Sequence, residues 1–287
     1  MTAIHLLRCK AEPLPQGDAF SEEMSAVDVL IKSFLARPTA SVRRNSTWHI
    51  GNTVESKAGW ITFALGREAV LLAPQFDEKL REFKEVEQAH APFTVGVFDP
   101  RDQTIGILIR PGVSLNAREV AAKIEALLES AGVARRANRQ VRVDFIPDPT
   151  GFIESIRSAH RITRFEFSFT LPNPPDDNKY IQRPLKEFAA KAGAVEGKAA
   201  FKGDNLDKDE IEEVSIAVAA SGDDATANIQ SSPRAPIVRK RLSVNALREA
   251  IESTELTGKI GGIGAAIHQA MRRAYSNLRK PPENVSE

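Results

Sequence analysis

The chain has 287 residues, of which 42 % are hydrophobic and 27 % are charged, which excludes an intrinsically disordered protein and allows one large domain or two. The formal net charge is only +1, and no apolar run approaches the roughly 20 residues that a membrane-spanning helix needs. Cys9 is the only cysteine, which excludes an internal disulfide, and no signal-peptide pattern begins the chain, so we expect a cytoplasmic protein.

The first half of the chain predicts several strands and two helices. Ser21 and Asn116 are residue types that cap helix N-termini, and each precedes apolar residues at helical spacing. Gly132 is the expected end of the second helix. A polar turn around Pro100 separates two apolar runs and predicts an antiparallel hairpin. The predicted strands are 4–9, 47–50, 60–65, 93–98, 104–109 and 141–145, and the predicted helices are 24–35 and 117–131.

The second half interleaves strands with shorter helices. The predicted strands are 162–169, 195–201, 225–229 and 236–242, and the predicted helices are 152–157, 185–191, 208–219, 244–251 and 260–278. Because there is no regular βαβ alternation, we expect an α+β fold with mainly antiparallel sheets. The Pro/Gly-rich stretch 147–151 predicts two subdomains, an N-terminal α+β domain (1–150) and a C-terminal α+β domain (151–287).

The last predicted helix combines an apolar stripe with several glycines. The stripe predicts a buried face or, as an alternative, a dimer face, and consists of Ile260, Ile263, Ile267, Met271 and Leu278. The glycines at 258, 261, 262 and 264 fit neither phosphate-loop pattern. We expect them to allow close packing of the helix against another backbone.

One short pattern matches a catalytic motif. Pro175-Asp176 followed by Glu196-Gly197-Lys198 resembles the PD-(D/E)xK arrangement, in which two carboxylates hold a divalent cation that activates water. Glu196 and Lys198 fall on a predicted strand, where alternation points both to one face. Asp176, however, lies in a proline-rich loop, and a helix separates it from Glu196. A metal-dependent nuclease is therefore an alternative interpretation and not the leading one.

Arginine and lysine cluster in three segments, 135–142, 239–241 and 272–280, and segregated charge can build a basic face on a neutral protein. On a strand, Arg239 and Arg241 share a face about 7 Å apart, which suits neighbouring phosphates and predicts affinity without sequence specificity. We expect both side chains to face solvent; the alternative is that they pair with the acidic helix 209–213. The candidate nucleic-acid-binding residues are Arg135, Arg136, Arg139, Arg239, Lys240, Arg241, Arg272 and Arg273.

A family resemblance starts near residue 93. The stretches 104–106 (TIG), 164–169 (RFEFSF) and 192–197 (AGAVEG) occur in an order of elements that resembles the RexA-type phage-exclusion proteins of temperate phages. The resemblance implies a dimeric, sequence-independent DNA-binding protein that senses phage replication and activates a membrane-protein partner. The resemblance does not identify which residues of this chain would contact DNA.

The leading hypothesis is a non-enzymatic protein that binds double-stranded DNA and forms a homodimer, with no catalytic residue, metal or cofactor expected. The first alternative is the metal-dependent nuclease with Asp176, Glu196 and Lys198. The second is a protein-interaction scaffold with no nucleic-acid role, which basic segments dispersed over the folded surface would favour.

Overall fold

The computed structural model describes residues 2–14, 22–42, 46–113, 115–171, 181–252, 256 and 260–279. These residues form seven helices and fourteen strands, and the paired strands run antiparallel. The predicted α+β class is confirmed. Among the described helices, none combines the length and the apolar character needed to cross a bilayer.

The first sheet is built around the long buried strand β1 (Thr2–Pro13). Its strand order is β14-β1-β8-β7-β4-β3-β2, and β9 pairs with the second half of β1. The other members are β2 (Thr39–Val42), β3 (Ser46–Glu55), β4 (Ile61–Arg67), β7 (Phe93–Asp99), β8 (Thr104–Leu108), β9 (Arg139–Phe145) and β14 (Arg248–Ile251).

Helices cover both faces of this sheet. Alternation along β1 points Leu7 and Cys9 into the core under α1 (Ala26–Leu35), α2 (Ala117–Ser130) and α3 (Val133–Arg136). Ile4 and Leu6 point the other way, into the core that includes α7 (Ile260–Arg279). The apolar stripe of α7 is thus buried in the protein's own core, except for Ile260, which is partly buried against it.

Two helix starts show how local chemistry sets the element bounds. The Asn116 side chain accepts hydrogen bonds from the backbone N–H groups of Arg118 and Glu119, so α2 starts where the sequence predicts. α1 is capped by Ser25, which accepts from the N–H of Asp28. The expected cap, Ser21, lies outside the described residues.

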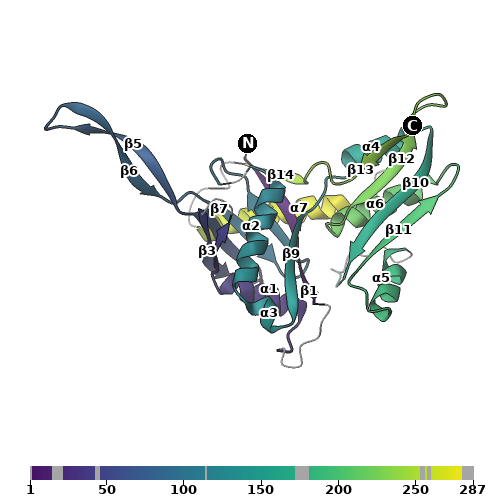
Figure 1. The fold of residues 1–287 in the computed structure, drawn as a ribbon, viewed down its shortest axis with the longest axis horizontal. Helices are drawn as coiled ribbons and strands as arrows, with labels where there is room; N and C mark the ends of the chain where they lie inside the picture. The colour runs from purple at the N-terminus through teal and green to yellow at the C-terminus, as the bar shows by residue number, and fades with distance from the viewer. Residues whose placement is uncertain are drawn as a thin grey trace.

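The second sheet has the order β11-β10-β12-β13. Its strands are β10 (Arg161–Thr170), β11 (Glu196–Lys202), β12 (Ala225–Gln230) and β13 (Val238–Arg241). Phe165, Phe167 and Phe169 alternate along β10 and pack into one core with apolar residues of α4 (Thr150–Arg157) and α6 (Lys208–Ala220). α5 (Gln182–Lys191) packs beside β10 and β11. Figure 1 shows the two sheets next to each other, with α7 between them.

Buried cations of β1 join the two sheets. The Lys10 ammonium donates to Thr170 Oγ1 (2.7 Å) and Asp223 Oδ1 (3.0 Å), and Arg8 donates to the backbone carbonyl of Ala220. The chain changes sheet close to the predicted boundary at residue 150, but β14 and α7 return to the first sheet. The division into 1–150 and 151–287 stays a prediction.

The predicted helix at 244–251 is wrong. Leu247 and Ile251 have helical spacing, yet the N–H of Leu247 donates to the carbonyl of Ile146, and its own carbonyl accepts from the N–H of Leu6. The segment then continues as β14, which pairs with the start of β1. The exposed edge of β1 needs backbone partners, and this requirement overrides the helical pattern.

A two-stranded arm is the one large feature that the sequence analysis did not predict. β5 (Ala69–Asp77) and β6 (Glu82–His90) pair with each other and, among the described strands, with no other. They are inserted between β4 and β7, which are neighbours in the first sheet. Figure 1 shows the arm extending away from the body.

Candidate nucleic-acid interface

The candidate site lies on the face of the second sheet opposite α4 and α6. Along β10, the core-facing phenylalanines alternate with Arg164, Glu166 and Ser168, so polar side chains cover the other face. β11 follows the same rule and brings Lys198 and Lys202 to this polar face. The face therefore collects cations that are far apart in the sequence.

Strand register arranges these cations in rows. Directly paired residues of antiparallel strands present their side chains on the same face. One row runs across all four strands as Lys202, Arg164, Asn228 and Arg239, and the next row contains Ala200, Glu166, Thr226 and Arg241. The predicted pair Arg239 and Arg241 thus belongs to a larger group with Arg164, Lys198 and Lys202.

Glu166 lies at the centre of this group. Its buried carboxylate pairs with Arg164 (Nη2 to Oε2, 2.6 Å), with Lys198, and more distantly with Arg239 (Nη2 to Oε1, 3.5 Å). Hydrogen bonds from Lys198 and Arg164 lower the pKa of Glu166 to about 2. One negative charge faces three positive charges, so this part of the face remains positive.

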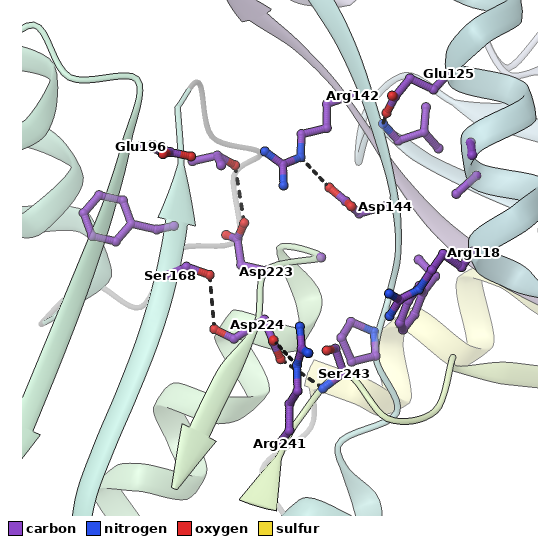
Figure 2. A pocket seen from close by; sticks show the side chains of 18 of the residues that line it. Arg118, Glu125, Arg142, Asp144, Ser168, Glu196, Asp223, Asp224, Arg241 and Ser243 are labelled. Carbon is purple, nitrogen blue, oxygen red and sulfur yellow. Dashed lines mark hydrogen bonds and ion pairs between the residues drawn. The ribbon is translucent and has the colours of Figure 1, made fainter.

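A second carboxylate orients Arg241. The Arg241 Nε donates to Asp224 Oδ2 (2.6 Å), and Asp224 Oδ1 accepts from the N–H of Ser243 (3.0 Å). Figure 2 shows Arg241 and Asp224 joined by this contact, with Ser243 beside them. The side chains of Arg239 and Arg241 are 64 % and 59 % exposed, as expected for solvent-facing residues. Their acidic partners are Glu166 and Asp224 and not residues of the helix 209–213.

The polar face continues into a cleft of about 600 Å³ between the two sheets. Arg118 of α2 and Arg142 of β9 line the far wall, and Lys198 and Arg241 belong both to the cleft and to the open face. The cleft also contains carboxylates: Glu125, Asp144, Glu196, Asp223 and Asp224. Arg142 Nε pairs with Asp144 Oδ2 at 2.9 Å. The cleft is therefore mixed in charge, and the cationic excess is on the open face.

The carboxyl of Glu125 differs in character from that of Glu166. Burial raises the pKa of Glu125, while the hydrogen bond from the N–H of Val143 acts in the opposite direction. The surroundings thus raise the pKa of Glu125 at the wall formed by α2 and β9, and they lower the pKa of Glu166 on the open face.

The remaining predicted residues lie elsewhere. Alternation puts Lys240 on the opposite face of β13 from its neighbours. On α7, Arg272 pairs with Asp102 (2.5 Å), and its neighbour Arg273 pairs with Glu249 (3.5 Å). Arg135, Arg136 and Arg139 lie on α3 and at the start of β9, at the lower end of the first sheet in Figure 1 and away from β13.

The predicted basic segments thus do not converge. Arg136 is near Glu22 (3.6 Å), and Arg139 Nη1 donates to the carbonyl of Ala11 (3.0 Å). Dispersal favours the scaffold alternative over a single basic site made of all three segments. The cationic group on the second sheet instead combines β13 with Arg164, Lys198 and Lys202, which the sequence analysis did not select.

The described residues include only part of the motif on which the nuclease alternative depends. Glu196 and Lys198 do share one face of β11 and line the cleft. Asp176 lies outside the described residues. Within the part of the chain that the structure describes, no three His, Cys, Asp or Glu side chains are grouped to hold a metal ion.

The chain matches no protein-family model, and no curated protein shows significant sequence similarity to it. The resemblance to RexA-type proteins therefore stays a prediction. The assignment of the site rests on its geometry and charge.

Proposed function

We propose that the open face of the second sheet binds the phosphate backbone of double-stranded DNA without reading its sequence, and that the protein is not an enzyme. The observation that carries this proposal is the group of five cations, Arg164, Lys198, Lys202, Arg239 and Arg241, which strand register places on one face. With the resemblance to RexA-type proteins, the proposal extends to phage exclusion in the cytoplasm, a homodimer and a membrane-protein partner.

The hydrogen-bonding capacity of the arginines supports phosphate contact. A guanidinium has five N–H donors, and Arg241 uses Nε for Asp224 while Arg239 uses Nη2 for Glu166 and Thr226. The remaining donors of two oriented, exposed guanidiniums suit phosphate oxygens. The backbones of Lys202 and Arg239 are three strand spacings apart, about 14 Å, so the face offers several phosphate contacts.

The absence of stacking groups favours a duplex over a single strand. Binding of single-stranded nucleic acid usually combines cations with aromatic side chains on which bases stack. The rows described above contain no aromatic residue, and Phe201 alternates to the opposite face of β11. Backbone contact with a duplex needs no such group.

Binding to two unrelated duplexes and one single strand of equal length, measured at several salt concentrations, tests the proposal. We expect equal affinity for both duplexes, weaker binding to the single strand, and a fall in log K with log salt of slope about −3 to −5, as three to five phosphate contacts predict. An absence of binding at low salt, or an affinity that does not change with salt concentration, would contradict the proposed electrostatic binding to DNA.

A separate assay decides between this proposal and the nuclease alternative. Plasmid is incubated with the protein and Mg²⁺ or Mn²⁺, and Glu196→Ala serves as the control variant. We expect intact plasmid under all conditions. Cleavage that Glu196→Ala abolishes would reverse the ranking of the two functions.

A further inference from the structure

The arm formed by β5 and β6 presents an unusual amount of apolar surface to solvent. Among its large apolar residues, Phe83 is 82 % exposed, Val70 68 % and Leu72 56 %. The arm is an insertion between two strands that would otherwise be joined by a short turn, because β4 and β7 are directly paired. Removal of the arm would leave the strand pairing of the first sheet intact, so the arm is not needed for the fold of the body.

Strand register places most of this apolar surface on one face. The pairs on that face are Val70 with Ala89, Leu72 with Glu87, Pro74 with Glu85, and Phe76 with Phe83. The ring centroids of Phe76 and Phe83 are 5.0 Å apart, which shows that both rings lie on the same side. We call these eight residues the apolar arm face. The opposite face has fewer large apolar residues, Leu71 and Val86, and carries Gln75, Lys84 and Gln88 beside them.

An arm of this kind needs a covering surface. An isolated two-stranded ribbon is marginally stable in water, and a contiguous exposed apolar patch on a protein marks an interaction site. Within the described residues, the arm strands pair only with each other, and the contact between Phe76 and Phe83 is internal to the arm. The described part of the body therefore leaves these arm residues exposed.

We propose that the apolar arm face lies on the body of a second copy of this chain, in a two-fold dimer that exchanges arms. This proposal gives a contact surface to the homodimer of the proposed function, and it does not rest on DNA binding, since the arm and the open face of the second sheet are separate surfaces. The structure assigns the dimer contact to the arm and not to α7, whose apolar stripe is buried inside the chain.

The area of the arm favours a second copy over a different partner. A ribbon of nine residue pairs is about 30 Å long and about 10 Å wide, so one face covers about 300 Å². One arm on one unrelated protein would bury about 600 Å² in total, which is the size of a non-specific crystal contact. Two-fold exchange doubles this to about 1,200 Å², the lower limit of stable interfaces, and two-fold dimers are the commonest assemblies.

The charge of the arm argues against a membrane as the partner. Glu85 and Glu87 lie among the apolar residues of the apolar arm face. A lipid surface with anionic headgroups would repel both carboxylates, and the acyl region would have to desolvate them. A protein surface can instead offer hydrogen-bond donors at fixed positions.

Sedimentation velocity of the full chain between 1 and 100 µM, without DNA, tests the proposal. We expect the parent to be a dimer and Leu72→Lys/Phe83→Lys to be a monomer at concentrations where the parent is dimeric. The matched control, Gln75→Lys/Gln88→Lys, adds the same charge to the opposite face and should stay dimeric. The circular dichroism spectra of all three should agree, because the arm is outside the core, whereas loss of the dimer should lower the thermal stability of Leu72→Lys/Phe83→Lys alone.

A parent that is monomeric at 100 µM, or a Leu72→Lys/Phe83→Lys variant that remains dimeric, overturns the proposal. So does a monomeric parent that binds vesicles of anionic lipid. A second measurement locates the contact: a photoreactive group is attached to Phe83→Cys, whose thiol is the only exposed one because Cys9 is buried. We expect cross-linked dimers with the attachment on body residues; cross-links confined to one chain contradict the exchange.

Discussion

At the residue scale, the two carboxylates Glu166 and Asp224 decide which cations of the second sheet are held in place. Each accepts hydrogen bonds from an arginine while leaving other donors of that arginine in solvent. Their negative charge reduces the positive potential of the face, whereas their hydrogen bonds hold the arginine side chains in fixed orientations. The proposed binding face therefore holds its arginines in defined positions and carries less net positive charge.

Glu166→Gln tests this balance through stability. The pKa of Glu166 is about 2, below the ordinary value near 4.3, so its ionised form stabilises the folded state above pH ~4.3, and that contribution is lost as pH falls toward 2. Because its cationic partners are exposed, solvent screening limits the expected loss in Glu166→Gln to about 1 to 2 kcal/mol at pH 7. Urea unfolding from pH 7 down to pH 2 measures it.

The same variant should bind duplex DNA more tightly, since three cations lose their counter-charge. A variant that is less stable at pH 7 but binds DNA no better would separate a structural role of Glu166 from the proposed interface. A stability difference that persists unchanged at pH 2 would contradict the assignment of the ion pairs.

At the element scale, close packing of α7 on the first sheet depends on one glycine of the group that the sequence singled out. A Cβ on Gly264 would lie 2.7 Å from Cγ2 of the buried Thr62 on β4, whereas a Cβ on Gly262 would meet nothing within 4 Å. Close packing of the helix backbone on the Thr62 side chain therefore explains Gly264, and no such contact explains Gly262.

Alanine at these two positions should have opposite effects. Gly264→Ala is expected to destabilise the protein by about 1 to 3 kcal/mol, because overpacking forces the helix away from β4. Gly262→Ala should stabilise it by up to about 1 kcal/mol, since alanine loses less backbone entropy in a helix. Thermal unfolding compares them directly; two shifts of the same sign would refute the packing argument.

Local signals predicted the elements that depend on neighbouring residues. Asn116 caps the start of α2, and Gly132, which follows the end of α2, has a left-handed φ of 71°. The turn around Pro100 joins β7 to β8. Pairing between distant segments had no such signal. The pairing of β14 with β1 joins residues as far apart as Thr2 and Ile251, which are separated by 249 positions. The register that brings Lys202, Arg164 and Arg239 into one row likewise depends on backbone partners from distant segments.

At the scale of the whole molecule, the buried ion pair between Lys10 and Asp223 connects the two sheets. Lys10→Met should destabilise the protein by about 3 to 5 kcal/mol, because it leaves the buried Asp223 carboxylate without its cation. Lys10→Met/Asp223→Asn removes both charges and should recover part of that loss. Denaturant unfolding of both variants measures this, and a double variant less stable than Lys10→Met would contradict the pairing.

Separate surfaces of the molecule thus have separate proposed tasks. The open face of the second sheet is proposed for phosphate contact, the apolar arm face for a second copy, and the core between the sheets holds them together. A variant of one surface should leave the other unaffected. Leu72→Lys/Phe83→Lys should therefore retain duplex binding per chain, with loss only of the gain that two linked sites provide.

The salt dependence of duplex binding by Arg239→Glu/Arg241→Glu, compared with the parent by fluorescence anisotropy, tests the central claim most directly. We predict weaker binding to every duplex sequence alike and a slope of log K against log salt that is smaller by about 2, with an unchanged circular dichroism spectrum. Lys240→Glu, on the opposite face of β13, should change the slope by less than 1. A double variant that binds with the parent's affinity and slope would show that this face is not the nucleic-acid site.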